Sequence, residues 1–182
     1  HVALSQRVIL PLAEDLMTLT ANFEPILANP LDRAELLAER RDWTLDRPSS
    51  DEVVMAVEGG WCALTLTMNW RDDLESLLVA AAYELKVPEK RREEIARLLA
   101  LINSQLVHGH FDFWENEASI VFRGGLLLAG GAEANDAQCE GLIRLAVDNC
   151  QRYYPAIQFV IWAGHTAAQA LDSALLETHG EA

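Results

Sequence analysis

PEKRREEIARLLALINSQLVHGHFDFW, residues 88–114, is the stretch that decides the fold class of this chain. Its apolar residues first recur at steps of three and four, the pattern of a helix with one buried face: Ile95, Leu98, Leu99, Ile102 and Leu106. Pro88 suits the first turn of that helix, and Gly109 suits a left-handed end. Beyond Gly109 the period drops to two, which places Phe111 and Phe113 on one face of a β-strand. The stretch therefore predicts a helix over residues 88–107 that leads into a sheet.

More strands are predicted upstream of this helix. Apolar residues alternate over residues 53–57 and 64–70, and Gly59–Gly60 between them is typical of a hairpin turn. Residues 74–87 are ambiguous, because ESLLVAAAYEL has helical propensity while its apolar residues keep a period of two. We predict a third strand here, and a helix is the alternative.

Two further helices are predicted in the last third of the chain. Asn135 and Gln138 have the spacing of a capping box that opens a helix, and Thr166 and Gln169 repeat that spacing later. Pro155 lies between the two boxes and is expected to kink or break the first helix.

The predicted order of elements is α-β-β-β-α-β-β-α with an added terminal helix. A short helix over about residues 31–42 begins it, and residues 111–114 and 119–128 form the second hairpin. Strands in runs, with helices between and after them, indicate an α+β fold with an antiparallel sheet. We predict a five-stranded sheet with the helix over residues 88–107 packed on one face.

Composition limits the classes of partner. The chain of 182 residues has a formal net charge of −14, a field that repels nucleic acid and anionic lipid. No stretch has the roughly eighteen uninterrupted apolar residues of a membrane span, and no signal peptide is recognisable. Three cysteines without CxxC spacing argue against a disulfide framework or a structural zinc site. We therefore expect a cytoplasmic protein that binds neither nucleic acid nor membrane.

Motifs that carry chemistry are few. His108 and His110 flank Gly109 and could share a metal ion, but a helix end is the simpler interpretation. Neither a phosphate-binding loop nor a GxSxG nucleophile motif is present. We therefore expect no catalytic residue, no cofactor and no metal ligand.

Aromatic residues suggest a protein-binding surface instead. Of the five tryptophans, Trp61 and Trp114 fall on the polar phase of their strands or at an edge. Exposed aromatic side chains often mark interfaces, although packing within the core or at a sheet edge is the alternative. Both tryptophans are candidate protein-binding residues.

Residues 1–29 are predicted to be an amphipathic helical extension, separate from the domain over residues 30–182. Apolar residues recur in it at alternating steps of three and four, as in a helix seam: Ile9, Leu12, Leu16, Leu19, Phe23 and Ile26. An isolated helix of this length is marginal in water, so its apolar face must be buried on something. We expect it to dock on the domain or on a partner subunit, which makes Leu12, Leu16, Leu19 and Phe23 candidate binding residues; a frayed tail is the alternative.

The sequence resembles the YbjN family of bacterial sensory transduction regulators. Four stretches carry the resemblance: WRDDLESLLVAAAYELKVPEKRREEIARLLALINSQLVHGHFDFW, VFRGGLLLAGGA, AQCEGLI and CQRYYPAIQFVIWAG, beginning at residues 70, 121, 137 and 150. The resemblance covers about residues 31–182. It implies a fold like that of type III secretion chaperones, and a non-enzymatic regulatory or chaperone-like protein that binds another polypeptide. It also implies a homodimer, which that fold often forms.

Two other functions remain open from the sequence. One is a small-molecule or metal-binding protein, or an enzyme, with a cleft near His108 and His110. The other is a structural subunit of a larger complex.

Overall fold

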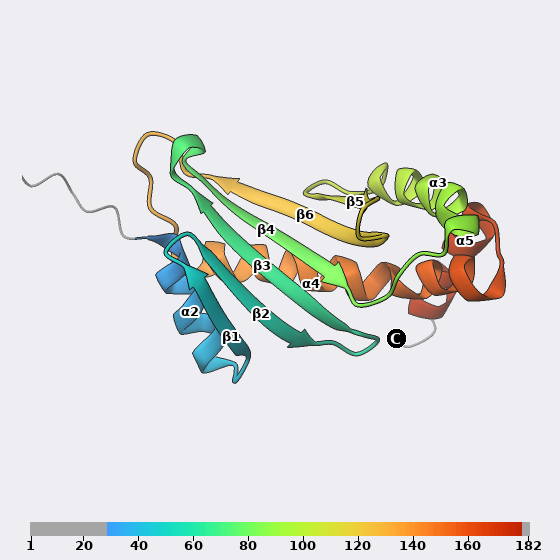
Figure 1. Ribbon diagram of the computed structural model, residues 1–182, viewed down its shortest axis with the longest axis horizontal. Helices are drawn as coiled ribbons and strands as arrows, with labels where there is room; N and C mark the ends of the chain where they lie inside the picture. Colours follow the sequence, from blue (N-terminus) through green and yellow to red (C-terminus); the bar gives the residue numbers. More distant parts are fainter. Residues whose placement is uncertain (1–28, 180–182) are drawn as a thin grey trace, which may run out of the picture.

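The computed structural model describes residues 29–179 as one antiparallel sheet with helices on one of its faces and at one end (Figure 1). The strands lie in the order β1-β2-β3-β4-β6-β5. The main elements are α2 (Pro30–Arg40), β1 (Thr44–Ser49), β2 (Glu52–Glu58), β3 (Ala63–Arg71), β4 (Ser76–Tyr83), α3 (Arg92–Asn103), β5 (His110–Trp114), β6 (Ser119–Leu127), α4 (Asp136–Gln158) and α5 (Ala167–His179). Short helical turns precede β4 (η1, Asp72–Leu74) and α3 (η2, Glu89–Arg91), and η3 (Phe159–Ala163) follows α4.

The α+β class and the antiparallel sheet are as predicted, but the sheet has six strands instead of five. The missed strand is β1, whose sequence TLDRPS reads as a turn because proline cannot donate a ladder hydrogen bond. Pro48 is tolerated because β1 is an edge strand that pairs only with β2, and the pairing shifts register between Asp46 and Ser49. An edge strand of this kind lacks the alternating apolar residues by which strands are recognised in a sequence.

The ambiguous stretch before residue 88 is a strand, as predicted. In β4 the side chains of Leu77, Val79, Ala81 and Tyr83 are buried, and the residues between them are half-buried. β4 pairs with β3 on one side and with β6 on the other, so it lies in the centre of the sheet. This tertiary position outweighs the helical propensity of its alanines.

The helix that covers the sheet is α4, whereas the helix predicted to do so is α3. α4 contacts β4 and β6, while α3 packs against β5 and α5 at one end of the molecule (Figure 1). The stripe of α3 is buried as predicted at Ile95, Leu98 and Ile102, but the helix spans only Arg92–Asn103. Gly109 does have a positive φ of 72°, yet it lies in the loop before β5 and not at the helix end.

Helix ends follow the capping rules. Both capping boxes are formed: Asn135 Oδ1 accepts the Gln138 N–H at 2.9 Å, and Thr166 Oγ1 accepts the Gln169 N–H at 3.4 Å. Pro155 does not break α4 at its own position, because the helix runs on to Gln158. The helical path ends nine residues after Pro155, at Gly164, which has a φ of 74°.

The core lies between the sheet and the α2–α4 layer. An aromatic group links the two: the Phe111 ring meets Phe122 edge-on at 5.2 Å and Tyr153 edge-on at 5.9 Å between centroids. The Tyr83 hydroxyl donates to the Cys150 carbonyl at 2.8 Å, which fastens β4 to α4. Because all the described helices that touch the sheet centre lie on this side, the other face of the sheet carries no second layer within residues 29–179.

Candidate binding surface

The uncovered side of the sheet, which we name the open face, is built by the alternate residues that point away from α4. Most of its members are exposed or half-buried, and two, Ser119 and Val121, are buried; the others include Val54, Ala56, Thr65, Thr67, Asn69, Leu78, Ala80, Ala82, His110, Asp112, Trp114, Arg123, Gly125 and Leu127. The pairing register aligns them in rows, such as Thr67, Ala80, Arg123 and His110 across β3, β4, β6 and β5. The face is therefore one continuous surface.

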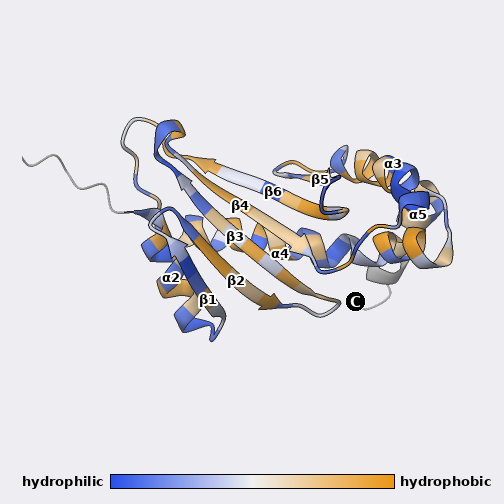
Figure 2. Cartoon of the chain, viewed as in Figure 1, coloured by the Kyte–Doolittle hydropathy of each residue, from blue (hydrophilic) through white to orange (hydrophobic). Residues whose placement is uncertain are grey.

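The central strand β4 is apolar on both of its sides (Figure 2). Its eight residues SLLVAAAY include no charged residue, and Leu78, Ala80 and Ala82 lie on the open face. Sheets with one solvated face normally alternate apolar and polar residues, whereas strands buried on both faces read as continuous apolar runs. The sequence of β4 is that of a strand covered on both faces.

Two hollows lie side by side on the open face and share Asn69 and Leu78. The larger, of about 480 Å³, runs across the strands and is also lined by Ala80, Arg123, His110 and Trp114. The smaller, of about 390 Å³, reaches from Leu78 to Ser49, Asp51 and Glu52 at the β1–β2 turn. Together they form a track, which we name the open-face track, from the β1–β2 turn to β5.

Polar groups mark the two ends of the track. Near the β1–β2 turn, Asn69 Nδ2 donates to Glu52 Oε2 at 2.9 Å. At the β5 end, Arg123 and Asp112 form a loose ion pair at 3.5 Å, and both side chains are nearly half exposed. The middle of the track, at Leu78 and Ala80, has no charge of its own. An apolar centre between polar ends suits an amphipathic ligand.

The edges of the sheet are blocked, unlike its open face. On β5, the Asn103 side chain donates to the Phe111 carbonyl at 2.9 Å and accepts the Phe111 N–H at 2.7 Å. The other edge, β1, carries Pro48 and a register shift. Such features prevent a further strand from pairing with an edge.

The two candidate tryptophans are both exposed, as predicted, but they do not form one site. Trp114 is 39% exposed and lines the open-face track at the end of β5. Trp61 is 53% exposed in the β2–β3 loop, where its N–H donates to the Gln151 side chain of α4 at 2.7 Å. Leu12, Leu16, Leu19 and Phe23 lie outside the described residues, so their predicted role stays a prediction.

Of the two histidines, only His110 lines the open-face track. Both side chains are exposed. Within residues 29–179, no group of three histidine, cysteine or acidic residues is placed to hold a metal ion. At this position the His110 imidazole lines the same hollow as the Arg123 and Trp114 side chains.

Sequence reasoning missed Asn69, Leu78, Ala80 and Arg123 as members of the site. The signal that could have found them is the second apolar phase of β4, in which Leu78, Ala80 and Ala82 stand where polar residues are normally found. The partners Asn69 and Arg123 follow only from the register of β3 and β6, which the sequence does not state.

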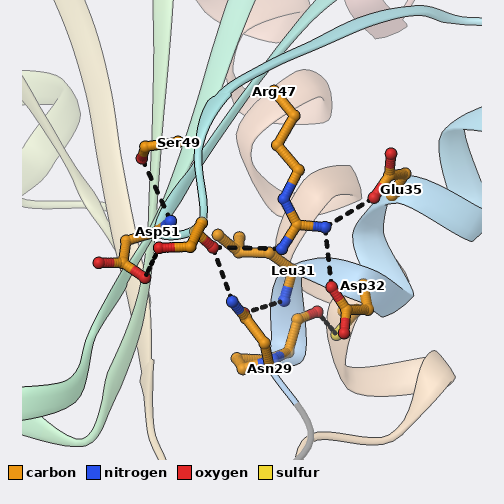
Figure 3. Close-up of polar contacts among 10 residues, drawn as sticks. Asn29, Leu31, Asp32, Glu35, Arg47, Ser49 and Asp51 are labelled. Carbon is orange, nitrogen blue, oxygen red and sulfur yellow. Dashed lines mark hydrogen bonds and ion pairs between the residues drawn. The ribbon is translucent and has the colours of Figure 1, made fainter.

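The corner where the described chain begins is tied firmly to the sheet (Figure 3). Asn29 caps α2 by accepting the Leu31 N–H at 3.0 Å, and its amide donates to the Ser50 carbonyl at 2.7 Å. Arg47 of β1 donates to Asp32 at 2.8 Å and to Glu35 at 2.7 Å, both on α2. The described chain therefore begins beside the β1–β2 turn.

Removing the Arg47 clamp should weaken the fold measurably. We expect Arg47→Ala to lower the free energy of unfolding by about 1 kcal/mol, because two charge-assisted contacts of a side chain only 25% exposed are lost. Urea unfolding measures the change. Arg40→Ala is the control, since its ion pair with Asp136 is long, at 3.7 Å, and 64% exposed on the arginine side; equal losses in both variants would contradict the clamp.

The three cysteine side chains are buried or half-buried. Cys139 and Cys150 are buried on one face of α4, and Cys62 is half-buried near α4. Burial raises the pKa of Cys150 to about 12 and that of Cys62 to about 11, and it also raises the pKa of Cys139. Because the thiolate is the reactive form, none of the three is set up as a nucleophile at neutral pH.

We expect the folded protein to resist alkylation at pH 8. Iodoacetamide should modify Cys150 and Cys139 negligibly and Cys62 slowly over an hour, while all three react in guanidinium chloride; mass spectrometry counts the adducts. Raised folded-state pKa values also mean that the thiols stabilise the fold below pH 9 and that this contribution falls as pH rises towards 12. Rapid labelling of Cys150 at pH 8 would contradict its burial.

A further hollow lies between α2, β2 and α4. It has a volume of about 300 Å³, and Arg41 on its rim pairs with Glu140 across the two helices. Charged side chains surround it, including Glu58, Arg144 and Asp148. Its apolar lining comes from Leu37, Trp43, Val57, Ile143 and Val147.

In residues 29–179, none of the helices combines the length and apolar character that crossing a bilayer requires.

Comparison with known proteins identifies a family and a similar solved structure. The family model YbjN, described as "Putative bacterial sensory transduction regulator", matches residues 30–159. A search of curated proteins returns no match. Among solved structures, the chain is similar to one described as "Crystal structure of YbjN, a putative transcription regulator from E. coli", with 10% identity and a TM-score of 0.49, over 81% of this chain and 93% of that one.

Proposed function

Because the chain belongs to the YbjN family, we propose that it is a non-enzymatic regulator that binds an amphipathic segment of another polypeptide on the open face of its sheet. The single observation that carries the proposal is the double apolar character of β4, whose Leu78, Ala80 and Ala82 lie on an uncovered face. The likeness to type III secretion chaperones, and the chaperone-like activity it implies, are part of this proposal and rest on the sequence resemblance.

The geometry of the track favours a helix or short peptide over an added strand or a polyanion. Both sheet edges are blocked, by Asn103 at β5 and by Pro48 at β1, so a partner strand has no free ladder to join. A net charge of −14 repels nucleic acid. An apolar floor with Trp114 at one end suits the apolar side of a helix or a short peptide.

Site-specific photocrosslinking tests the proposal. A photoreactive amino acid at position 80 should capture a partner, and mass spectrometry of the crosslinked peptide identifies the bound segment. A synthetic peptide of that segment should bind the purified protein, and Ala80→Arg should weaken this binding at least tenfold. Ala100→Arg is the matched control, because Ala100 is exposed on α3, away from the track. Equal affinity for wild type and Ala80→Arg would overturn the proposal.

A small-molecule ligand beside His110 is the alternative function. Arg123, His110, Asn69 and Trp114 supply polar and aromatic groups around the larger hollow, which suits a compact anionic or aromatic compound. His108 is not among the lining residues of that hollow. A crosslink at position 80 only to a small molecule, with no polypeptide captured, would favour this alternative.

The homodimer stays a prediction, and the blocked edges limit how it could form. A dimer would have to pack through the open face or through the helix layer. We expect light scattering at micromolar concentration to give twice the chain mass of 20.2 kDa. A mass of a single chain would contradict the dimer and leave the peptide-binding proposal intact.

A further inference from the structure

We infer that residues 9–26 of this same chain are the resident occupant of the open-face track, so that a partner must displace them. The inference rests on the proposed function for its regulatory meaning, because it makes the N-terminal segment a built-in competitor for the partner site. Its physical basis is independent and has three parts: what the face lacks, where the described chain begins, and how long the segment before it is.

The apolar residues of β4 on the open face have no packed layer over them among residues 29–179, although the sequence of β4 is that of a strand buried on both faces. Leu78, Ala80 and Ala82 of β4 have no helix packed over them among residues 29–179, and Leu127 is 69% exposed at the end of β6. The apolar seam of residues 9–26, by contrast, has nothing in its own sequence to cover it, since fewer than three heptads do not form a stable coiled coil. One uncovered apolar face and one uncovered apolar seam in the same chain complement each other.

The point of attachment brings the seam to the track. Asn29 is held at the β1–β2 turn by its bond to Ser50, and Ser49 and Asp51 of that turn line the smaller hollow. The Trp70 N–H donates to the Asp51 carbonyl at 3.0 Å, which places the ends of β3 and β2 at the same point. Ile26 lies three positions before Asn29, a reach of about 10 Å, so the segment can start beside the track.

The lengths also agree. A helix from Pro11 to Glu24, which ends before Pro25, would be about 21 Å long at a rise of about 1.5 Å per residue. From β2 to β5 the track crosses four strand spacings of about 4.8 Å each, or about 19 Å. A helix laid from the β1–β2 turn would therefore reach the Trp114 end of the track, and the small side chains of Ala80 and Gly125 allow close approach.

Hydrogen exchange of the full chain, read by mass spectrometry, tests the inference. We expect amides within residues 9–26 to exchange at least tenfold more slowly in the wild type than in Ala80→Arg, and Ala100→Arg to match the wild type. A double variant, Leu16→Glu with Leu19→Glu, should lose the same protection without touching the domain. Equal exchange of residues 9–26 in wild type, Ala80→Arg and the double variant would overturn the inference.

A trans-binding assay gives a second, independent readout. A labelled synthetic peptide of residues 5–28 should bind the full-chain Leu16→Glu, Leu19→Glu variant at least tenfold more tightly than the wild type, because only the variant has a vacant track. Equal binding to both proteins would overturn the resident-occupant inference.

The two proposals fail separately. If Ala80→Arg weakens the binding of the crosslinked partner peptide but leaves residues 9–26 unprotected in every protein, the proposed function stands and the inference falls. If Ala80→Arg releases residues 9–26 but leaves partner binding unchanged, the inference stands and the partner site lies elsewhere. A position-80 crosslink to residues 9–26 of the same chain supports the inference directly.

Discussion

Replacing Gly109 with alanine is expected to lower the free energy of unfolding by about 2–5 kcal/mol, for two separate reasons. The residue has a φ of 72°, a left-handed conformation that disfavours any side chain. A Cβ added there would also overlap the Phe122 ring and come within 2.8 Å of the Arg123 carbonyl oxygen. The ring is enclosed in the core and the carbonyl belongs to the sheet, so neither can move aside cheaply. Urea unfolding measures the change.

Substitutions at two other glycines separate the effect of the positive φ from the effect of the close contacts. Gly130 has a φ of 78° and no atom within 4 Å of the point where a Cβ would lie, so Gly130→Ala isolates the backbone term of about 1–2 kcal/mol. Gly60 has open space and no positive φ, so Gly60→Ala should change stability by less than about 1 kcal/mol. If Gly109→Ala were no worse than Gly130→Ala, the close packing of Phe122 on the loop would be wrong.

Gly109 also shows how far sequence reasoning reaches. Its positive φ was predictable from residue type, because a glycine between a helix and a strand usually serves a turn. Its position was not, because the helix ends at Asn103, where the Asn103 side chain turns to bind Phe111 on β5. That choice depends on a strand eight residues later, and no local pattern reports it.

The main error about the fold concerned which helix covers the sheet: α3 was predicted to do so, whereas α4 does. The apolar stripe of α3 is real, but stripes state only that a face is buried and not which element buries it. α4 covers the sheet through a buried stripe that mixes small side chains with large ones, among them Cys139, Leu142, Ile143, Ala146, Cys150 and Tyr153. Both helices therefore carry a buried stripe, and the stripes alone do not say which of the two lies on the sheet.

The proposed binding surface was partly predictable from the sequence. Trp114 was identified from its phase on the strand, and the structure places it on the open-face track. Arg123 and Asn69 could not be identified, because they reach the track through cross-strand register, in which Arg123 lies opposite His110 and Asn69 opposite Leu78. Register is set by long-range pairing, and a one-residue slip would turn both side chains to the core.

Truncating Phe122 to alanine is expected to have the largest effect of any single change considered, a loss of about 3–5 kcal/mol. The side chain is fully buried on β6, and its ring meets Phe111 edge-on with centroids 5.2 Å apart. Alanine would leave a cavity between the sheet and α4 that rigid strands cannot close. Phe122→Leu, which keeps most of the apolar volume, should lose less than half as much, and calorimetry or urea unfolding compares the two.

A double-mutant cycle joins this change to Gly109. Because the Phe122 ring is one of the two groups that a Cβ at position 109 would strike, Phe122→Ala should make Gly109→Ala less harmful. We expect the losses in free energy of unfolding of the two single variants, added together, to exceed the loss in the double variant by at least about 1 kcal/mol. The Arg123 carbonyl and the positive φ remain in the double variant, so Gly109→Ala should still destabilise it. Strict additivity would mean that the ring and the loop do not touch in solution.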